Sequence, residues 1–232
     1  MNYELISVIL PVYNQAGHIA EIVEEYETTL QRVHTPHELL LVVNGSRDNS
    51  LEVCQELAGK YSTIRVIHEA KGGWGLAVKR GIKEASGDLI CYTNSARTTG
   101  KDLTLLLLYA VAYPQVVIKA NRKIRENFRR RLGSLLYNLQ CRYLFDLSYW
   151  DINGTPKVFP RQFDRLLSLS RDDDLIDAEF NVICRRQDYP VLEVPIFSTK
   201  RHGGKSTTSY KSAFRMYWGA YQLWRAARKG EI

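Results

Sequence analysis

The chain has 232 residues, of which 45% are hydrophobic and 25% charged, and this ordinary composition excludes global disorder and a collagen-like structure. Its 32 Lys and Arg residues against 25 Asp and Glu residues leave a formal charge of +7. The excess indicates an anionic partner, for which a nucleic acid, a membrane surface and a phosphorylated small molecule are all candidates.

The cysteines and the apolar segments exclude further classes of protein. Cys54, Cys91, Cys141 and Cys184 form no Cys-x-x-Cys or Cys/His pair, so we expect no zinc site, no disulfide scaffold, and reduced thiols in a cytoplasm. Residues 1–8 lack the pattern of a secretory signal. The longest apolar run, at 103–113, has about half of the ~20 residues that a membrane-spanning helix needs.

The first half of the chain alternates predicted strands and helices. Five apolar, partly β-branched runs predict strands: 5–12, 38–43, 63–68, 88–93 and 115–119. Helices are predicted between them: 18–33, 48–59 with Asp48 as N-cap, a helix after the glycine-rich turn 71–75 that ends near 85, and 101–113. This alternation is typical of βαβ units and predicts an α/β, mostly parallel, Rossmann-like sheet flanked by helices.

The second half is less regular. Helices are predicted at 125–145, 162–169, 176–187 and 209–228, with a strand at 191–197 and loops at 171–174 and 198–209. No repeat or long linker divides the chain. We therefore expect one main domain at 1–208, with the C-terminal helix at 209–232 either part of it or facing a membrane.

Polar or glycine-rich turns follow four of the predicted strands. They lie at 11–15, 44–48, 68–75 and 94–97. Ligands of open α/β sheets bind beyond the carboxyl ends of the strands. Any one turn alone is more typical of an ordinary connection, but four at one edge indicate a site.

These segments carry a resemblance to a known family. The motifs that carry it are ISVILPVYN (6–14), ELLLVVNGSRDNS (38–50), KGGWGLAVKRGI (71–82), SGDLICYTNSA (86–96), DINGTPKVF (151–159), LIDAEF (175–180), EVPI (193–196) and RHGGKS (201–206). In this order they resemble family 2 glycosyltransferases of the GT-A fold, closest to the dolichyl- or polyprenyl-phosphate sugar synthases. The resemblance implies transfer of a hexose from a UDP- or GDP-sugar to a polyprenyl phosphate, with inversion at the sugar carbon.

The resemblance also assigns a nucleotide-sugar site. It implies that the donor binds at Pro11, Tyr13, Asn14, Asn44, Gly73, Asn94, Ser95, Arg201 and Lys205. Two departures concern the residues expected near the base: Gln15 stands where the family usually has an acidic residue, and Val43-Asn44 replaces its usual Asp-Asp.

The largest departure concerns a metal ion. The family's Asp-x-Asp, which holds Mg²⁺ or Mn²⁺ on the donor diphosphate, is here Asn94, Ser95 and Ala96. Hard divalent ions prefer anionic oxygen ligands, so we expect no metal ligands and no cofactor, with Mg²⁺ or Mn²⁺ kept as the alternative. The leaving diphosphate still needs charge stabilisation. Our hypothesis is that Arg97, with Arg201 and Lys205, supplies it through guanidinium and ammonium contacts.

The acceptor side is basic. Residues 119–131 hold seven cations and one anion. The resemblance implies that Arg122, and Arg130 or Arg131 in the following helix, bind the lipid phosphate, with Lys157 as a further candidate. A solvated helix face is the plain alternative. Nucleic-acid binding is disfavoured, because the run has one aromatic residue and no recognised nucleic-acid motif.

Carboxylates complete the candidate site. Asp151 and Asp177 match catalytic positions of the family, with Glu179 two residues beyond Asp177. A salt-bridge or capping role suits each of them about as well as a catalytic one. The turn at 171–174 is expected to be solvated.

The C-terminal helix carries an aromatic stripe beside cations. Its members are Tyr210, Phe214, Tyr217, Tyr221 and Trp224. Such a stripe suits the headgroup boundary of an anionic bilayer or packing on the protein itself or on a partner, either a membrane protein or a second copy. Residues 200–232 hold eight cations and one anion, so the excess of positive charge lies in two segments, 119–131 and 200–232.

We expect a cytoplasmic enzyme, peripheral at the membrane face. The alternative is a catalytically silent GT-A-like module that binds a nucleotide, lipid phosphate or protein.

Overall fold

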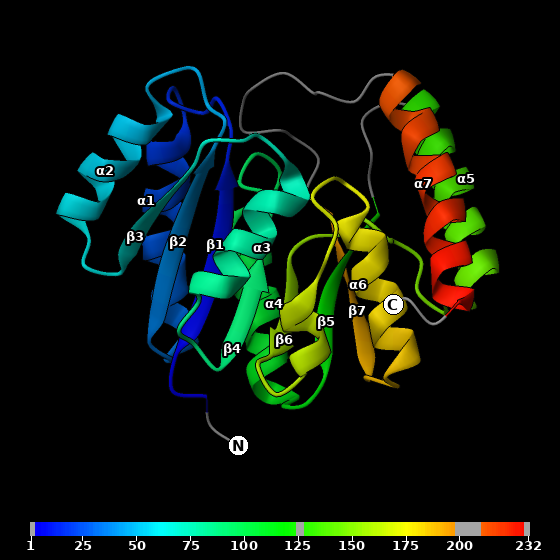
Figure 1. Cartoon of the computed structure of the whole chain (residues 1–232). Coiled ribbons are helices and arrows are strands. Elements are labelled where there is room, and N and C mark those ends of the chain that lie inside the picture. The colour runs from blue at the N-terminus through cyan, green and yellow to red at the C-terminus, as the bar shows by residue number, and fades with distance from the viewer. Residues whose placement is uncertain (1–2, 124–127, 198–209, 230–232) are drawn as a thin grey trace.

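A seven-stranded sheet forms the centre of the protein (Figure 1). The computed structural model describes residues 3–123, 128–197 and 210–229. The strands are β1 (Ile6–Val12), β2 (His37–Asn44), β3 (Ile64–Glu69), β4 (Leu89–Tyr92), β5 (Val117–Arg122), β6 (Lys157–Pro160) and β7 (Val191–Ile196). Their order is β3-β2-β1-β4-β6-β5-β7, and β6 runs antiparallel to both of its neighbours while the other pairs are parallel.

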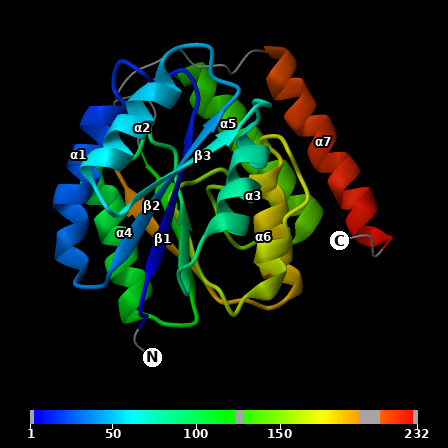
Figure 2. The ribbon, with the colours of Figure 1, turned by 60° about the vertical axis from the view of Figure 1, so that its left-hand side comes forward.

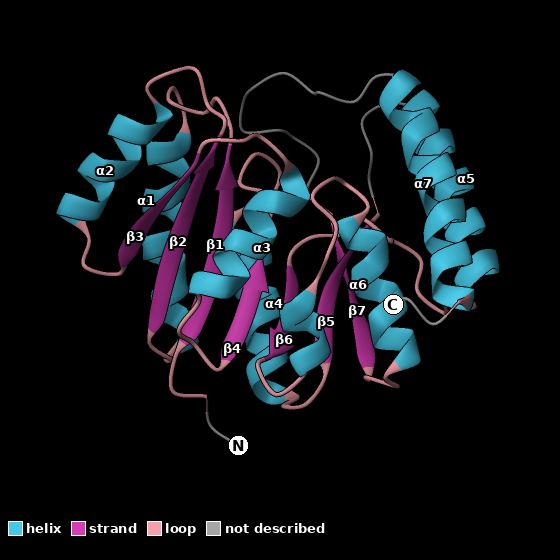
Figure 3. Ribbon diagram, viewed as in Figure 1, coloured by secondary structure: helices cyan, strands magenta, loops and turns pink. Residues whose placement is uncertain are grey.

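Helices cover both faces of this sheet (Figure 2). One face carries α1 (Ile19–Leu30), α2 (Ser50–Lys60) and α4 (Gly100–Ala112), and the other carries α3 (Trp74–Glu84) and α6 (Ile176–Arg186). Two long helices, α5 (Phe128–Phe145) and α7 (Tyr210–Arg228), pack side by side at the β7 end of the sheet (Figure 3). Two short 3₁₀ helices occupy Gln31–Val33 and Asp164–Ser168.

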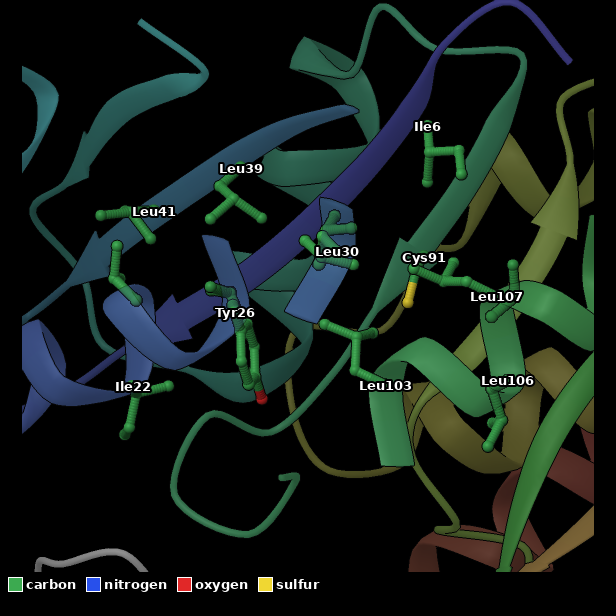
Figure 4. Close-up of a cluster of buried hydrophobic side chains, with 14 of the residues drawn as sticks. Ile6, Ile22, Tyr26, Leu30, Leu39, Leu41, Cys91, Leu103, Leu106 and Leu107 are labelled. Atoms are coloured by element: carbon green, nitrogen blue, oxygen red, sulfur yellow. The ribbon is translucent and has the colours of Figure 1, made fainter. Parts of the chain in front are cut away.

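The core alternates across the strands. Every residue of β1 is buried, and successive side chains enter opposite layers: Ile9 packs under α3 and Leu10 under α1. The layer beneath α1 and α4 includes Tyr26, Leu41 and Leu103 (Figure 4). A third cluster, which includes Tyr137, Cys141 and Leu223, joins α5, α6 and α7.

The sequence-based prediction of strands and helices holds with three differences. The strand β6 was not predicted, because it has only four residues and one of them is the charged Lys157. The segment 162–169 forms a 3₁₀ rather than an α-helix. Asn49, not Asp48, is the residue at the cap of α2, although Asp48 Oδ1 still accepts a hydrogen bond from the Ser50 amide at 3.2 Å.

All four cysteines are buried and free of disulfides. Across the described parts of the chain, no helix combines the length and apolar character needed to cross a bilayer.

Candidate active site

The four predicted turns meet at one edge of the sheet. They follow the carboxyl ends of β1, β2, β3 and β4, which are parallel to one another. Between β1 and β4 the strand order reverses, since β2 and β3 extend to one side of β1 and the later strands to the other. Such a reversal point leaves a crevice in which ligands of α/β proteins bind.

The Asn44 side chain connects three of these turns by hydrogen bonds. Its Nδ2 donates to the Val12 carbonyl at 3.0 Å, and its Oδ1 accepts from the Gly73 amide at 3.0 Å. Because its side chain is buried, Asn44 stabilises these turns from the protein interior. Gly45 has φ +57°, and a Cβ there would lie 2.5 Å from the Gly72 amide nitrogen. The turns after β2 and β3 are therefore in direct contact, which only glycine permits.

The residues assigned to the nucleoside divide into accessible and buried ones. Tyr13 is 43% exposed, and Asn14 is exposed while its Oδ1 accepts from the Arg47 amide at 2.8 Å. Pro11 lies buried within β1, opposite Val42 of β2. The exposed ring of Tyr13 and the rim of these turns thus offer the surface on which a nucleoside could stack.

The turn that replaces Asp-x-Asp faces inward. Ser95 is 1% exposed, and its Oγ donates to Gln15 Oε1 at 2.8 Å; Ala96 is also buried. Asn94 Oδ1 accepts from the Ala96 amide at 3.1 Å. Within the described ranges, no group of three or more His, Cys, Asp or Glu side chains converges. Neutral, internally bonded groups are poor ligands for Mg²⁺ or Mn²⁺, so these residues do not fit the metal that the family's motif would hold.

Arg97 closes the same turn. Its amide donates to the Asn94 carbonyl at 2.9 Å, and its side chain is half-buried. The position places a permanent cation beside the crevice between β1 and β4. Arg201 and Lys205, its proposed helpers, lie outside the described residues.

On the acceptor side, Arg122 and Asp151 form a bidentate ion pair. Arg122 Nε lies 2.7 Å from Asp151 Oδ2 and Nη2 lies 2.8 Å from Oδ1, while the Arg122 amide also donates to Oδ2 at 3.0 Å. The Asp151 side chain is buried, whereas the Arg122 side chain keeps 23% of its surface exposed. Asp151 therefore orients the guanidinium of a partly exposed arginine side chain at the end of β5.

Lys157 and Asp177 are brought together in the interior. Lys157 Nζ donates to Asp177 Oδ1, which also accepts from the Tyr92 hydroxyl at 3.0 Å, and Oδ2 accepts from Trp74 Nε1 at 3.2 Å. Burial lowers the pKa of Lys157, and the Asp177 charge opposes that shift. Because Lys157 has no exposed surface, the structure places it beneath the site and away from a dissolved phosphate. Trp74 belongs to the glycine-rich turn, so Asp177 links that turn to α6.

Glu179 braces a different turn. Its carboxylate accepts hydrogen bonds from the Ser170 amide, at 3.0 Å, from the Ser170 hydroxyl and from the Arg171 amide. Asp172, Asp173 and Asp174 are exposed, as expected of a solvated turn. Their backbone packs on α3, where a Cβ at Gly75 would lie 2.4 Å from the Arg171 carbonyl oxygen.

The last two candidate cations and the aromatic stripe involve α5 and α7. Arg130 and Arg131 lie in the first turn of α5, and their side chains are outside the described set.

The predicted aromatic stripe of α7 does not form one exposed face. Tyr217 packs edge-on against Tyr137 of α5, with ring centroids 5.7 Å apart, whereas Phe214, Trp218 and Tyr221 face solvent. The side chain of Tyr210 is not described.

Sequence reasoning missed two members of the buried polar network, Lys119 and Glu193. Lys119 was counted only as a member of the basic run 119–131, but it is completely buried. The apolar residues on both sides of it, in VVIKA, are the signal that could have revealed this.

A mostly parallel sheet with helices on both faces, and with polar and glycine-rich turns gathered at the carboxyl ends of β1 to β4, defines a doubly wound α/β protein. The sequence profile of glycosyl transferase family 2 matches residues 7–164. The chain belongs to this family, and the family and GT-A fold expected from the sequence are confirmed.

Two relatives match different shares of the chain. Glycosyltransferase GlyG of Streptococcus pneumoniae is 39% identical over 93 residues, which are 40% of this chain and 30% of that protein. Undecaprenyl-phosphate 4-deoxy-4-formamido-L-arabinose transferase of Proteus mirabilis is 23% identical over 88% of this chain and 63% of its own length. The chain thus spans less than two thirds of these relatives.

Solved structures share the fold at low sequence identity. Glucosyl-3-phosphoglycerate synthase from Mycobacterium tuberculosis, in complex with Mn²⁺, UDP and its product, superposes with a TM-score of 0.72 at 16% identity, covering 98% of this chain and 80% of that one. The mannosyltransferase PcManGT from Pyrobaculum calidifontis, with GDP-Man and Mn²⁺, gives a TM-score of 0.59 at 14% identity, covering 100% and 65%.

Proposed function

We propose that this chain transfers a hexose from a UDP- or GDP-sugar to a polyprenyl phosphate. The observation that carries the proposal is the partly exposed Arg122 side chain, whose guanidinium is oriented by buried Asp151 at the end of β5. Only β6 separates β5 from β4, so Arg122 and the turn after β4 are about two strand spacings, ~10 Å, apart. That separation suits an acceptor phosphate facing a donor diphosphate across one sugar. The undecaprenyl-phosphate transferase of Proteus mirabilis, which aligns over 88% of this chain, supports the same acceptor class.

The reaction would be a single displacement with inversion. A phosphate oxygen of the acceptor forms the new bond to the anomeric carbon as the bond from that carbon to the donor diphosphate breaks. A phosphate monoester is already anionic at neutral pH, so the nucleophile needs little help from a general base. Arg122 would hold this anion, with Arg130 and Arg131 assisting, and the diphosphate would leave with its charge stabilised by Arg97, Arg201 and Lys205.

An exposed apolar face supports a location at a membrane surface. On α5 it comprises Leu132, Leu135, Leu136, Leu139 and Tyr143, and on α7 Phe214, Trp218 and Tyr221, all of them exposed. Arg215, Arg225 and Arg228 lie on the same α7 helix. An apolar stripe next to cations binds anionic bilayers through buried area and charge together. We propose that this α5–α7 face rests on the cytoplasmic leaflet, where a polyprenyl phosphate presents its headgroup.

The decisive experiment measures transfer of radiolabelled sugar into extractable lipid. The full chain is incubated with UDP- and GDP-hexoses and undecaprenyl phosphate, with and without EDTA. The proposal expects a labelled lipid product that Arg122→Ala reduces at least about 100-fold. The control Arg80→Ala removes a partly exposed arginine that is paired with Glu84 on α3, and it should leave transfer intact. No product with any donor would contradict the proposal.

A second candidate is a catalytically silent module that binds a nucleotide, a lipid phosphate or a protein. The inward-turned Ser95 and the neutral Asn94-Ser95-Ala96 turn favour it. Thermal-shift screening with UDP, GDP and their sugars separates the two candidates when it is read beside the transfer assay. Ligand stabilisation without turnover supports the module, and turnover excludes it.

A further inference from the structure

A row of polar side chains crosses the sheet at one level. Tyr92 of β4 stands opposite Lys157 of β6, Lys157 opposite Lys119 of β5, and Lys119 opposite Glu193 of β7. Residues directly opposed on neighbouring strands point to the same face of a sheet. All four side chains therefore enter the layer beneath α6.

Lys119 is held in this layer by neutral and anionic partners. Its Nζ donates to Asn181 Oδ1 of α6 at 2.9 Å and lies 3.3 Å from Glu193 Oε1. The ring of Tyr149 is 5.1 Å away. Burying a charge is costly unless it is paired and hydrogen-bonded, so the Glu193 carboxylate stabilises the buried charge of Lys119.

The Glu193 carboxylate also fastens the segment that leads into Asp151. Oε1 accepts a hydrogen bond from the Asp151 amide at 3.0 Å, and Oε2 accepts from the Trp150 amide at 2.9 Å and from Asn121 Nδ2 at 3.3 Å. The side chain of Glu193 is only 15% exposed. Each of its oxygens thus serves two donors, and together they hold residues 150 and 151 against the β5–β7 edge.

We infer that Glu193 is a positioning residue that, through Asp151, aims the Arg122 guanidinium at the anionic group of the acceptor. The inference rests on the proposed function for the identity of that anion. Glu193 does not touch the ligand. It holds the main chain of Asp151, and Asp151 in turn holds Arg122 by three hydrogen bonds.

The substitution Glu193→Gln tests this arrangement with almost no change of volume. An amide keeps one acceptor oxygen and turns the other position into a donor. If the amide NH₂ takes the place of Oε1, it faces two donors, Lys119 Nζ and the Asp151 amide. If it takes the place of Oε2, it faces the Trp150 amide and Asn121 Nδ2, which are also donors. In either orientation two hydrogen bonds are lost, and part of the segment 150–151 is released. Glu193→Asp keeps both oxygens and should restore part of the lost function.

Glu38→Gln is the matched control. Glu38 lies on β2 of the same sheet, and its carboxylate accepts hydrogen bonds from Ser7 Oγ and the Ser86 amide, both at 2.6 Å. It therefore also fastens a loop to a strand, but at the other end of the sheet and away from Arg122. A general loss of stability would affect both variants, whereas a positioning role separates them.

Two readouts are measured on the chain of 232 residues. Steady-state kinetics should show the KM for undecaprenyl phosphate raised at least about tenfold by Glu193→Gln, with the KM for the sugar donor changed by less than about twofold. Nitrogen-edited NMR of arginine side chains, with the Arg122 Nε–H signal assigned by its loss in Arg122→Lys, should show that signal shifted and exchanging faster with water. Glu38→Gln should change neither readout.

The outcomes separate the inference from the proposed function. If the wild-type chain transfers no sugar, the proposed function fails, and an Arg122 signal unchanged by Glu193→Gln would overturn the positioning role independently. A shifted signal with an unchanged acceptor KM also overturns the inference as stated. If Glu193→Gln does not fold, the pair Glu193→Gln with Lys119→Met removes the unpaired buried cation and takes the same two measurements.

Discussion

Ser95 donates a hydrogen bond to Gln15 Oε1 at 2.8 Å, and both side chains are buried where β1 and β4 end. This neutral contact joins the two turns at positions where the family usually carries acidic residues. The two side chains satisfy each other, so they offer a divalent ion neither charge nor an outward-facing oxygen. We therefore propose that cations of the protein neutralise a donor diphosphate at this crevice.

The first prediction concerns chelation. We expect the Kd for UDP or GDP, whichever nucleotide binds, to change by less than about twofold when EDTA is added, because Asn94, Ser95 and Ala96 present no anionic ligand. Isothermal titration calorimetry with metal-stripped protein measures this. Binding that is lost with EDTA and restored by Mn²⁺ would contradict the prediction.

The second prediction concerns Arg97. Arg97→Ala should weaken nucleoside diphosphate binding about tenfold or more, because a charge-assisted contact to phosphate is worth roughly 1.5–3 kcal/mol. Arg97→Lys should retain part of the affinity, since it keeps the charge but loses the bidentate geometry. Fluorescence or calorimetric titration provides the measurement, with Arg80→Ala as the control. Equal affinity in all of these proteins would show that Arg97 does not face the diphosphate.

The third prediction concerns the buried pair of Lys157 and Asp177. Lys157→Met should lower the free energy of unfolding by about 3–5 kcal/mol, because it leaves the Asp177 carboxylate in the interior without its cation. Adding Asp177→Leu should recover part of that loss. Urea unfolding gives the values.

Lys60→Met serves as the control for this pair. Lys60 contacts Glu24 at 2.7 Å in an ion pair whose side chains are both more than half exposed. Its loss should leave the unfolding midpoint in place. Equal midpoints for Lys157→Met and the wild type would mean that the buried contact does not form in solution.

The fourth prediction concerns the α5–α7 face. Replacing Leu136 and Trp218, which are 50% and 54% exposed, by serine should remove most sedimentation with vesicles that contain anionic lipid, because the buried apolar area drives binding. Leu108→Ser is the matched control, since Leu108 is 44% exposed but lies on α4. Unchanged sedimentation of the double variant, or equal loss in the control, would refute the membrane role.

The fifth prediction concerns pH. Burial lowers the pKa of Lys119 from its usual 10.5 to about 8, although the Glu193 charge opposes the shift. At a pH between about 8 and 10.5, Lys119 is protonated in the unfolded chain but mostly neutral in the folded protein. Because the unfolded chain then binds more protons, the contribution of Lys119 to the free energy of unfolding rises with pH over this range. The total rise is about 3 kcal/mol.

Comparison with Lys119→Met isolates that rise. The buried thiols, Cys91 among them, have raised pKa values because of burial, and they lower stability at alkaline pH in both proteins. Lys157, whose pKa burial also lowers, remains in both as well. The free energy of unfolding of the wild type minus that of the variant should therefore increase across this range, measured by urea titration at several pH values. A flat difference would contradict the prediction.

The sequence by itself determined the class of fold and the edge that carries the candidate site. Apolar runs such as Ile6–Val12 are buried on both faces because helices cover both sides of a parallel sheet. The glycine-rich turn before α3 was recognisable from its composition, although the need for glycine there is tertiary, because a Cβ at Gly73 would lie 2.8 Å from the Asp172 carbonyl oxygen. Composition and periodicity act over a few residues, and they suffice to locate the strands, the helices and this turn.

Only the tertiary structure decided which of the charged groups are buried and paired and which stay accessible. The insertion of β6 between β4 and β5 places Lys119 and Lys157 opposite each other in the interior, where Glu193 and Asp177 neutralise them. Arg122, three residues after Lys119, instead reaches the strand end and stays partly exposed. All three residues carry the same charge in the sequence. Their different environments follow from strand order and long-range pairing, which local patterns of residues do not encode.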